Sequence, residues 1–425
     1  MQLNEDFLQY VWKYRLLTQR GVYCTNGELL RIIHPGALNS NAGPDFSTAK
    51  LVIGGQSWVG DVEIHNRSSD WIFHGHQQDK SYDKVILHAV YEEDEVICRT
   101  DGTIIPVLVL KGLIPESLRD NYKKLMEGNF FPCEKQIGLV NQGTVAKMLD
   151  QIIIERFMEK TAQLDEKMSQ NNHYWNETFY GLLMRNFGFK VNTVPFELLA
   201  AGLPITILAK HRDNPLQVEA LLFGQAGFLE GDFKDDYPKK LKAEYLFLRK
   251  KYLLIPGEPS IWKFMRMHPQ NFPVLRIAQA AGLLRSREHL FTDLLQETDL
   301  KKLIGIFSQI AVHPYWKTHS NFDRECKPMS VKLGRKSIEN LIINTICQMQ
   351  YCYGNYFKLT AFTKRSISLL KNIPAEQNVI ILKYRKAGVE VSSAYESQAV
   401  LQLNKNWCSQ KKCLNCRIGM EILNK

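Results

Sequence analysis

The chain has 425 residues, 45% of them hydrophobic and 23% charged, and a formal net charge of +10. This ordinary globular composition excludes a disordered, collagen-like or coiled-coil protein, and the length predicts about two or three domains. Residues 1–112 carry 10 Lys and Arg against 14 Asp and Glu, whereas residues 326–425 carry 16 against 5. An acidic N-terminal part is therefore joined to a basic C-terminal part. Such a basic surface suits a polyanion such as DNA or RNA, and the alternative is a solvated basic face.

Residues 1–112 have the periodicity of strands, preceded by a short amphipathic helix from Glu5 to Leu17. Turn residues such as Gly54-Gly55 separate the apolar runs. The polar stretch from Ser69 to Asp83 has room for one short helix. The expected order is therefore helix, three strands, short helix or loop, and two strands. The strands are expected at Leu29–Ile33, Ala49–Ile53, Ser57–His65, Val85–Tyr91 and Ile104–Leu110.

From about residue 140, apolar residues recur at i, i+3 and i+4, which predicts an all-α domain of about eight to ten helices. The fold class is thus α+β. We expect an α/β module over 1–112, a linker over 113–140, a helical domain over 141–400 and a basic, cysteine-containing tail over 401–425. The main helices are expected at Val145–Lys167, Thr178–Phe187, Pro195–Ala209, Val218–Phe228, Leu241–Tyr252, Phe272–Leu284, Leu300–Ile310 and Ile338–Tyr353.

The N-terminal module brings acidic and imidazole side chains together. Asp45 follows Gly43-Pro44, and Glu63 and His65 alternate on one face of a predicted strand. A hairpin through Gly54-Gly55 would bring Asp45 beside both of them. Carboxylates and an imidazole in this arrangement suit a divalent cation that activates water for phosphodiester hydrolysis. The alternative is that Asp45 is only a turn residue.

The strand order, with Pro44-Asp45 opening the second strand and Glu63-Ile64-His65 in the third, resembles the PD-(D/E)xK nuclease core over about residues 1–100. The resemblance implies a restriction-endonuclease-like αβββαβ module in which Asp45 and Glu63 hold Mg²⁺ or Mn²⁺. His65 stands where that superfamily has a Lys that positions or activates the attacking water. An imidazole can accept a proton from water or bind metal instead. Glu5 on the first helix is placed to supply an additional acid.

The whole chain also resembles an uncharacterised bacterial family of unknown function, from which no activity follows. The resemblance rests on Asn41-Ala42-Gly43-Pro44-Asp45-Phe46, Val62-Glu63-Ile64-His65, Ser69-Asp70-Trp71, Val85-Ile86-Leu87-His88 and Cys413-Leu414-Asn415-Cys416-Arg417-Ile418-Gly419.

Histidines are concentrated in the same module. His65, His74, His76 and His88 are four of the eleven histidines, and Asp70 and Asp79 lie among them. The His74-Gly75-His76 spacing lets two imidazoles reach one ion, usually Zn²⁺, Mn²⁺ or Fe²⁺. This predicts an alternative site, a histidine-centred hydrolase of small phosphoesters with Asp70 or Glu63 as base. His88 lies inside a predicted strand, where a buried sheet histidine is the expected role.

Three of the nine cysteines lie near the C-terminus, at Cys408, Cys413 and Cys416. Closed tetrahedral Zn²⁺ or a [4Fe–4S] cluster needs a fourth ligand, for which Cys133 and Cys352 are candidates. Cys133 with the three C-terminal cysteines is similar in outline to the cluster that clamps some recombination and CRISPR-associated nucleases, although the spacing differs. The alternative is a set of reduced thiols in the tail.

The helical part has a basic, aromatic-flanked stretch that suits phosphate contacts, or whose aromatic residues are simply core. Its members are Arg266, His268, Arg276, Arg285 and Arg287, with Trp262, Phe264 and Phe272. Neither GxGxxG nor GxxxxGK[ST] occurs, so no nucleotide cofactor is expected.

The sequence predicts a cytoplasmic protein without a membrane partner. The longest apolar run, Leu198–Ala209, contains Pro204 and is too short to span a bilayer. Residues 1–20 lack the layout of a signal peptide, and the cysteines are irregularly spaced, unlike those of a secreted disulfide scaffold.

Three functions remain open from the sequence. The first is a Mg²⁺- or Mn²⁺-dependent nuclease in which Asp45 and Glu63 bind the metal and His65 acts on the water. The second is a catalytically degenerate nuclease fold that binds nucleic acid or a partner protein. The third is the histidine-centred metal hydrolase.

Overall fold

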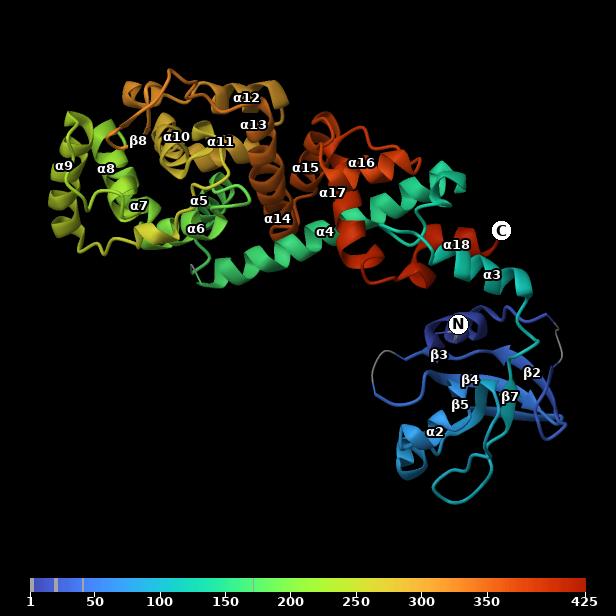
Figure 1. Ribbon diagram of the computed structural model, residues 1–425. Helices are drawn as coiled ribbons and strands as arrows, with labels where there is room; N and C mark the ends of the chain where they lie inside the picture. The colour runs from blue at the N-terminus through green and yellow to red at the C-terminus, as the bar shows by residue number, and fades with distance from the viewer. Residues whose placement is uncertain (1–3, 19–21, 40–41, 171) are drawn as a thin grey trace. The chain divides into compact units, whose positions relative to one another are not determined.

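The computed structural model describes residues 4–18, 22–39, 42–170 and 172–425, so Asn41 of the N-terminal motif lies outside it. Within these ranges the chain is α+β, with the main sheet near the N-terminus and helices over most of the remainder (Figure 1). Contacts divide it into two compact units. Unit 1 comprises residues 1–148, 383–389 and 403–425, and unit 2 comprises residues 149–382 and 390–402.

Unit 1 contains a mixed sheet in the order β1-β2-β4-β5-β6-β7, with β3 paired to β4. Strands β2, β4 and β5 pair antiparallel, whereas β6 is parallel to β5 and β7 is parallel to β6. The expected apolar runs all fall in strands, but the last strand is shorter than predicted. The strands are β1 (Val22–Tyr23), β2 (Leu29–His34), β3 (Ala37–Leu38), β4 (Phe46–Ile53), β5 (Gln56–Arg67), β6 (Val85–Glu92) and β7 (Val107–Val109).

The hairpin between β4 and β5 turns at Gly54 and Gly55, which have φ values of 58° and 84°. Two consecutive residues with positive φ make the turn whose twist suits an antiparallel hairpin, and glycine adopts this conformation without steric cost. Strand β6 is buried from Val85 to Val90. A strand without polar alternation is typical of a sheet covered on both faces.

One covering element is α1 (Glu5–Tyr14), which contacts β5. The side chain of Asn4 caps this helix by accepting a hydrogen bond from the Asp6 N–H. Its buried residues include Phe7 and Trp12, and the Trp12 indole N–H donates to the Pro35 carbonyl at 2.9 Å. The helix ends at Tyr14, before the predicted end at Leu17, because Arg15 adopts a left-handed conformation.

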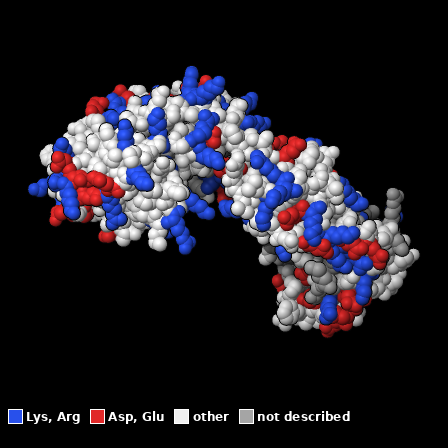
Figure 2. All heavy atoms as spheres, turned by 45° about the horizontal axis from the view of Figure 1, so that its top comes forward, with Lys and Arg blue, Asp and Glu red and all other residues white. Residues whose placement is uncertain are grey.

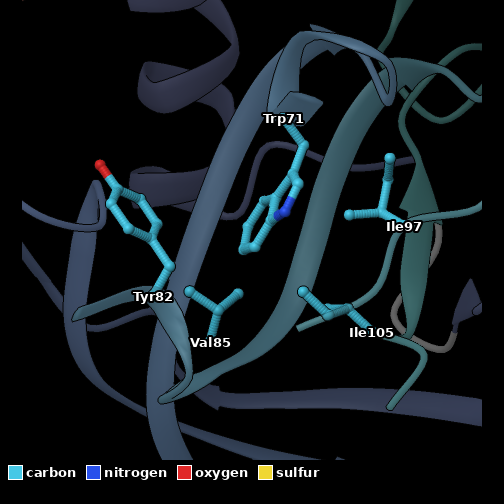
Figure 3. Close-up of a cluster of buried hydrophobic side chains, with 5 residues drawn as sticks. All are labelled: Trp71, Tyr82, Val85, Ile97 and Ile105. Atoms are coloured by element: carbon cyan, nitrogen blue, oxygen red, sulfur yellow. The ribbon is translucent and has the colours of Figure 1, made fainter. Parts of the chain in front are cut away.

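The other covering element is the segment between β5 and β6. It contains α2 (Asp70–Phe73) and two 3₁₀ turns, His76–Gln78 and Lys80–Tyr82. Figure 3 shows the Trp71 side chain between Tyr82 on one side and Ile97 and Ile105 on the other, above Val85. This cluster fixes the short helix to the sheet, which determines where the histidines that follow it lie.

The remainder of unit 1 comes from both ends of the chain. Residues 113–140, treated as a linker in the sequence analysis, contain α3 (Glu116–Leu125), and the C-terminal residues form α18 (Arg417–Leu423). These two helices contact each other, and Ile418 and Ile422 of α18 are buried. The 401–425 segment is therefore incorporated into unit 1 from residue 403 onward, because its apolar side chains pack there.

Unit 2 is helical, with one small hairpin, β8 (His319–Asn321) and β9 (Arg324–Glu325), that the all-α prediction did not include. The helix predicted over 195–209 is two helices, because Pro204 lacks the backbone N–H that would continue the first. The helix predicted over 338–353 is α13 and α14 joined by a π-helical stretch.

The helices after α3 are α4 (Gln142–Gln170), α5 (Trp175–Phe187), α6 (Thr193–Gly202), α7 (Ile205–Ala209), α8 (Pro215–Gln225), α9 (Asp236–Tyr252), α10 (Pro273–Ser286), α11 (Leu290–Gln296), α12 (Leu300–Ser308), α13 (Arg335–Leu341), α14 (Gln348–Tyr356), α15 (Thr360–Asn372), α16 (Val379–Lys386) and α17 (Ala394–Leu403). No helix within the described ranges combines the length and the apolar character needed to cross a bilayer.

Candidate metal centre

A backbone hydrogen bond and the buried side chain of Trp71 hold the histidine-rich segment after β5 in place. Arg67 donates its backbone N–H to Asp70 Oδ2 at 2.8 Å at the start of α2, and buried Trp71 anchors the helix. His74 ends the helix, and Gly75 has a φ of 77°. The left-handed glycine turns the chain between two histidines. As a result His74 and His76 both face the sheet residue His65.

Three imidazoles meet at this point. One nitrogen from each of His65, His74 and His76 lies within 4.8 Å of the others. The closest pair is His74 Nδ1 and His65 Nε2, at 3.1 Å. His65 comes from β5, whereas the other two come from the turn after α2, so the fold joins two separate segments in one set of donors.

Glu63 completes this set. Its Oε1 lies 3.4 Å from His65 Nε2 and 3.4 Å from His76 Nε2. Ligands about 2.1 Å from one ion stand about 3.4 Å apart in a tetrahedron. Glu63 therefore places one carboxylate oxygen at this ligand-to-ligand spacing from two of the three converging imidazoles, His65 and His76. We refer to Glu63, His65, His74 and His76 as the three-histidine site.

The protonation state of His65 suits metal binding. Burial, with His88, His74 and His76 close by, lowers the pKa of His65 to about 2, so its ring is neutral at physiological pH. His76 Nε2 is buried and has no hydrogen-bond partner among the described residues. The Glu63 carboxylate lies 3.4 Å from this nitrogen without forming a hydrogen bond, and a bound cation would satisfy both groups.

His88 supports the site from β6. Its Nε2 lies 2.9 Å from His65 Nδ1, and its ring is fully buried. If His65 binds an ion through Nε2, its Nδ1 carries the proton and donates it to His88 Nε2. A hydrogen bond of this kind fixes the tautomer and orientation of a metal-ligating histidine. The sequence suggested only a structural role for His88, and the structure adds this contact.

Asp45 lies beside the three-histidine site but bonds elsewhere. Its Oδ1 accepts from Gln9 Nε2 at 2.9 Å and its Oδ2 from the Ile64 N–H at 3.1 Å, while its own N–H donates to Glu63 Oε2 at 2.9 Å. Burial and the neighbouring Glu63 raise the pKa of Asp45 to about 7. Asp45 and Glu63 are thus adjacent, as expected from the hairpin, but Asp45 is not one of the four converging donors.

The other acidic candidates divide into two groups. Glu5 lies near enough to Glu63 and His74 to feel both charges, and burial raises the pKa of its carboxyl. Asp70 accepts a hydrogen bond from the Arg67 N–H just before α2, and Asp79 accepts from the Ser81 N–H in an exposed turn. Neither Asp70 nor Asp79 joins the three converging imidazoles.

Tyr82 is a site residue that the sequence analysis missed. Its ring stacks on that of His76, and it also belongs to the Trp71 cluster. The available signal was weak: Tyr82 is an aromatic residue at the end of a polar stretch rich in histidine.

Four of the five candidate cysteines belong to unit 1, Cys133 through residues 1–148 and the other three through residues 403–425. Cys133, Cys413 and Cys416 are buried and Cys408 is half-buried. The Tyr384 hydroxyl lies 3.2 Å from Cys408 Sγ, and the Tyr384 ring stacks on Phe131, close to Cys133 in sequence. Burial raises the pKa of the Cys133 thiol, and Cys408, Cys416 and Cys413 are close enough to raise it further. The other candidate, Cys352, lies in unit 2.

The four sulfur atoms are not packed as tightly as the histidine nitrogens. Within the described ranges, no three of them come within 4.8 Å of one another. Thiolates around one Zn²⁺ at about 2.3 Å stand only about 3.8 Å apart. In an iron–sulfur cluster each thiolate binds a different iron, so the sulfur atoms lie farther apart. The backbone N–H groups of Ile418 and Gly419 donate to the Cys416 thiol.

Comparison with known proteins identifies the family of the chain but gives no activity for it. No curated protein and no solved structure matches the chain. One family, described as "Protein of unknown function (DUF2851)", matches residues 5–379. Since this match covers most of the chain, the protein belongs to that family of unknown function.

Proposed function

We propose that unit 1 is a metal-dependent hydrolase that cleaves phosphodiester bonds of nucleic acid. The observation that carries the proposal is the convergence of nitrogen atoms from His65, His74 and His76 within 4.8 Å, with Glu63 beside them. The imidazole-rich donor set favours Zn²⁺, Mn²⁺ or Fe²⁺ over Mg²⁺, which prefers oxygen ligands. This combines two interpretations of the sequence, because Glu63 belongs both to the acidic pair and to the histidine cluster.

The topology around the site supports phosphodiesters as the substrate class. Apart from the two-residue strands β1 and β3, the chain order is a helix, the antiparallel strands β2, β4 and β5, a short helix and the parallel strand β6, which is the order that the resemblance to the restriction-endonuclease-like αβββαβ core implies. By the same resemblance, Asp45 and Glu63 would correspond to the acidic residues of that core. The resemblance concerns topology and motif only. The histidines distinguish this site from the PD-(D/E)xK motif, which has a Lys where this chain has His65.

Each side chain then has a role. The bound ion would polarise the scissile phosphate and lower the pKa of a water molecule. Glu63, His65, His74 and His76 would hold the ion, with His88 and Tyr82 orienting two of the rings. Asp45, fixed by Gln9 and the Ile64 N–H, is the nearest carboxyl outside these four, and we assign it to orient the attacking water and accept its proton.

The test combines metal content with cleavage. The wild-type protein should retain about one equivalent of a transition metal after dialysis, and it should cleave DNA or RNA when supplied with that metal. His74→Ala should lose both properties, whereas His289→Ala, which alters an exposed histidine of unit 2, should lose neither. Asp45→Asn should keep the metal and lose cleavage.

Two outcomes would overturn this proposal. One is full metal retention by His74→Ala. The other is an intact, metal-loaded wild-type protein that leaves single- and double-stranded DNA and RNA uncut with Zn²⁺, Mn²⁺, Fe²⁺ and Mg²⁺. In the second case, the protein would be tested for nucleic-acid binding. Binding that weakens with salt and that Asp45→Ala leaves unchanged would favour the hypothesis of a catalytically degenerate, nucleic-acid-binding protein.

We also propose that Cys133, Cys408, Cys413 and Cys416 hold a metal centre that links the two ends of the chain within unit 1. The separation of the sulfur atoms favours a [4Fe–4S] cluster over a single Zn²⁺. Anaerobically purified wild-type protein should then contain iron and acid-labile sulfide in equal amounts. Cys413→Ser should lose both, and Cys24→Ser, a change at another buried thiol of unit 1, should retain them. Zinc in place of iron would identify a single-ion site, and the absence of any metal would refute the proposal.

A further inference from the structure

Unit 2 contains a cationic cavity that the proposed hydrolase site does not use. The cavity has a volume of about 350 Å³ and lies between the end of α5, the segment before α10 and the start of α13. Lys190, Arg266, His268 and Arg276 are among the residues that line it, and none of its lining residues within the described ranges is Asp or Glu. On the face shown in Figure 2, Lys and Arg side chains are scattered, with acidic side chains among them. A cavity lined by cations and by no acidic residue among those described is therefore a more specific feature than the scattered surface charge.

The cavity is distinguished by a buried arginine. Arg276 is only 5% exposed, and burial lowers its pKa to about 10, which leaves it charged at physiological pH. Its guanidinium donates to Gln279 Oε1 at 2.9 Å and to Asn271 Oδ1 at 2.6 Å, with Ser337 Oγ at 3.4 Å. All three of these partners are neutral. The guanidinium also lies over the Phe189 ring, 4.5 Å from its centroid.

This arrangement leaves a charge without a counter-charge. Arg276 Nε is buried and has no hydrogen-bond partner among the described residues. An ionised group removed from water is costly unless it is paired with an opposite charge. The neutral partners orient the guanidinium without neutralising it. An anion beside Arg276 in the cavity would supply the opposite charge.

Two residues of the cavity wall adopt unfavourable backbone conformations. Phe189 has a φ of 48° and Arg266 a φ of 59°, although neither is glycine. For a bulky residue, the left-handed conformation costs free energy and persists only where the surrounding structure imposes it. Both residues contribute side chains to the cavity. The strain thus falls on residues that would contact a ligand.

We propose that this cavity binds the phosphate group of a nucleotide, with Arg276 at its base and Lys190 and Arg266 at its rim. Arginine matches the geometry of phosphate oxygens with paired N–H donors, and the exposed rim cations would attract the ligand from solution. The cavity is larger than one phosphate needs, and the half-buried Phe189 ring in its wall suits the attached nucleoside. The phosphate could belong to a free nucleotide or to the 5′ end of a nucleic-acid strand.

Calorimetric titration of the full-length chain tests this proposal with two matched pairs of probes. The first pair is adenosine 5′-monophosphate and adenosine. The second is one short single-stranded oligonucleotide with and without a 5′-phosphate. We expect the phosphate-bearing member of at least one pair to bind at least about tenfold more tightly than its partner. Binding of the monophosphate indicates that a free nucleotide suffices, whereas binding of the phosphorylated strand alone identifies the strand end as the ligand.

Variants identify the residues that bind the phosphate-bearing probe. Arg276→Gln should weaken binding of the phosphate-bearing probe at least about tenfold, and because this residue is buried, Arg266→Gln and Lys190→Gln provide exposed changes that leave the core intact. Lys263→Gln, at an exposed lysine that does not line the cavity, serves as the matched control and should bind as wild type does. His76→Ala should also bind normally, which separates this cavity from the three-histidine site.

Three results would overturn the proposal. The first is equal binding of the phosphorylated and unphosphorylated members of both pairs. The second is wild-type affinity for the phosphate-bearing probe in Arg266→Gln, in Lys190→Gln and in an Arg276→Gln variant that is shown to be folded. The third is loss of binding in His76→Ala, because the phosphate would then be bound at unit 1.

Discussion

The ring of Tyr82 stacks on the ring of His76, with centroids 3.8 Å apart and planes inclined by 19°. Tyr82 is nearly buried and also packs against Trp71, so one side chain connects the hydrophobic cluster to the three-histidine site. His76 therefore has its orientation fixed before any ion binds. Preorganisation of this kind reduces the entropy that ligands lose when they bind a metal.

A change at Tyr82 should consequently weaken metal binding. Tyr82→Ala removes the stacked ring, and we expect metal affinity to fall about 10- to 100-fold, the range seen when groups that orient metal ligands are lost. Tyr82→Phe keeps the ring and should stay close to wild type. Competition with a metallochromic chelator would measure both affinities. Equal affinity in the alanine and wild-type proteins would show that the stack has no orienting role.

Trp71 allows a test of stability as well as of metal binding. Trp71→Ala empties the centre of the cluster in Figure 3, and it should lower the free energy of unfolding by about 3–5 kcal/mol. Metal content should fall with it, because His74 directly follows α2. Phe73, in the same short helix, is 86% exposed, so Phe73→Ala should change stability by less than about 0.5 kcal/mol. Urea unfolding of the two variants would compare them directly.

Replacing glycine by alanine should have opposite effects on stability at two helical positions of unit 2. A Cβ on Gly224 would lie 2.2 Å from ring atoms of Tyr245, whereas a Cβ on Gly181 would meet nothing within 4 Å. Gly224→Ala should therefore destabilise unit 2 by about 1–3 kcal/mol through overpacking. Gly181→Ala should stabilise it by up to about 1 kcal/mol, since alanine favours a helix. Thermal unfolding followed by circular dichroism should give melting temperatures that move in opposite directions.

Glu219 makes the stability of unit 2 depend on pH. Burial raises the pKa of its carboxyl to about 7, although the Tyr237 hydroxyl donates to it at 3.1 Å and Arg285 opposes the shift. The folded state thus holds the proton more tightly than the unfolded state, whose pKa is near 4.5. Stability from this group is fully present below about pH 4.5 and is lost as the pH rises to about 7. The loss amounts to about 3 kcal/mol.

Glu219→Gln should remove this dependence, because the amide does not ionise. Urea unfolding at several pH values between 4.5 and 7 would show it as a flatter curve than that of the wild type. Glu258→Gln, a change at an exposed carboxyl, is the control and should keep the wild-type slope. If Glu219→Gln and the wild type showed the same slope, Glu219 would not be the source of the pH dependence.

The strands near the site could be predicted because the pattern that encodes them is local. Gly54-Gly55 specifies a hairpin, and that hairpin alone brings Asp45 to Glu63. The density of histidines also pointed to His74 and His76. The sequence already placed Glu63 and His65 in both predicted sites, but the convergence of His74 and His76 on them was not predictable, because it depends on how far α2 lies from β5. That distance is set by the packing of Trp71, Tyr82 and Ile105, which are distant in sequence.

Other differences have similar causes. Periodicity over 195–209 continued across Pro204, whose backbone effect interrupts the helix. The role of residues 403–425 in unit 1 depends on contacts with α3, which lies far earlier in the chain, and no local pattern encodes such a contact. Likewise, a solvent-exposed tail and a packed terminal segment have much the same composition, so the basic residues around Cys413 did not distinguish the two.

Unit 1 is assembled from residues 1–148 and from two segments that follow residue 382, and this imposes an order on its biosynthesis. The ribosome delivers the sheet early, but it delivers α18 and three of the four clustered cysteines only after the whole of unit 2. During translation, α3 therefore lacks its partner α18 until the chain of unit 2 has emerged. Any ribosome that stops within unit 2 would release a chain whose unit 1 cannot be completed, and such chains should depend on chaperones or be degraded.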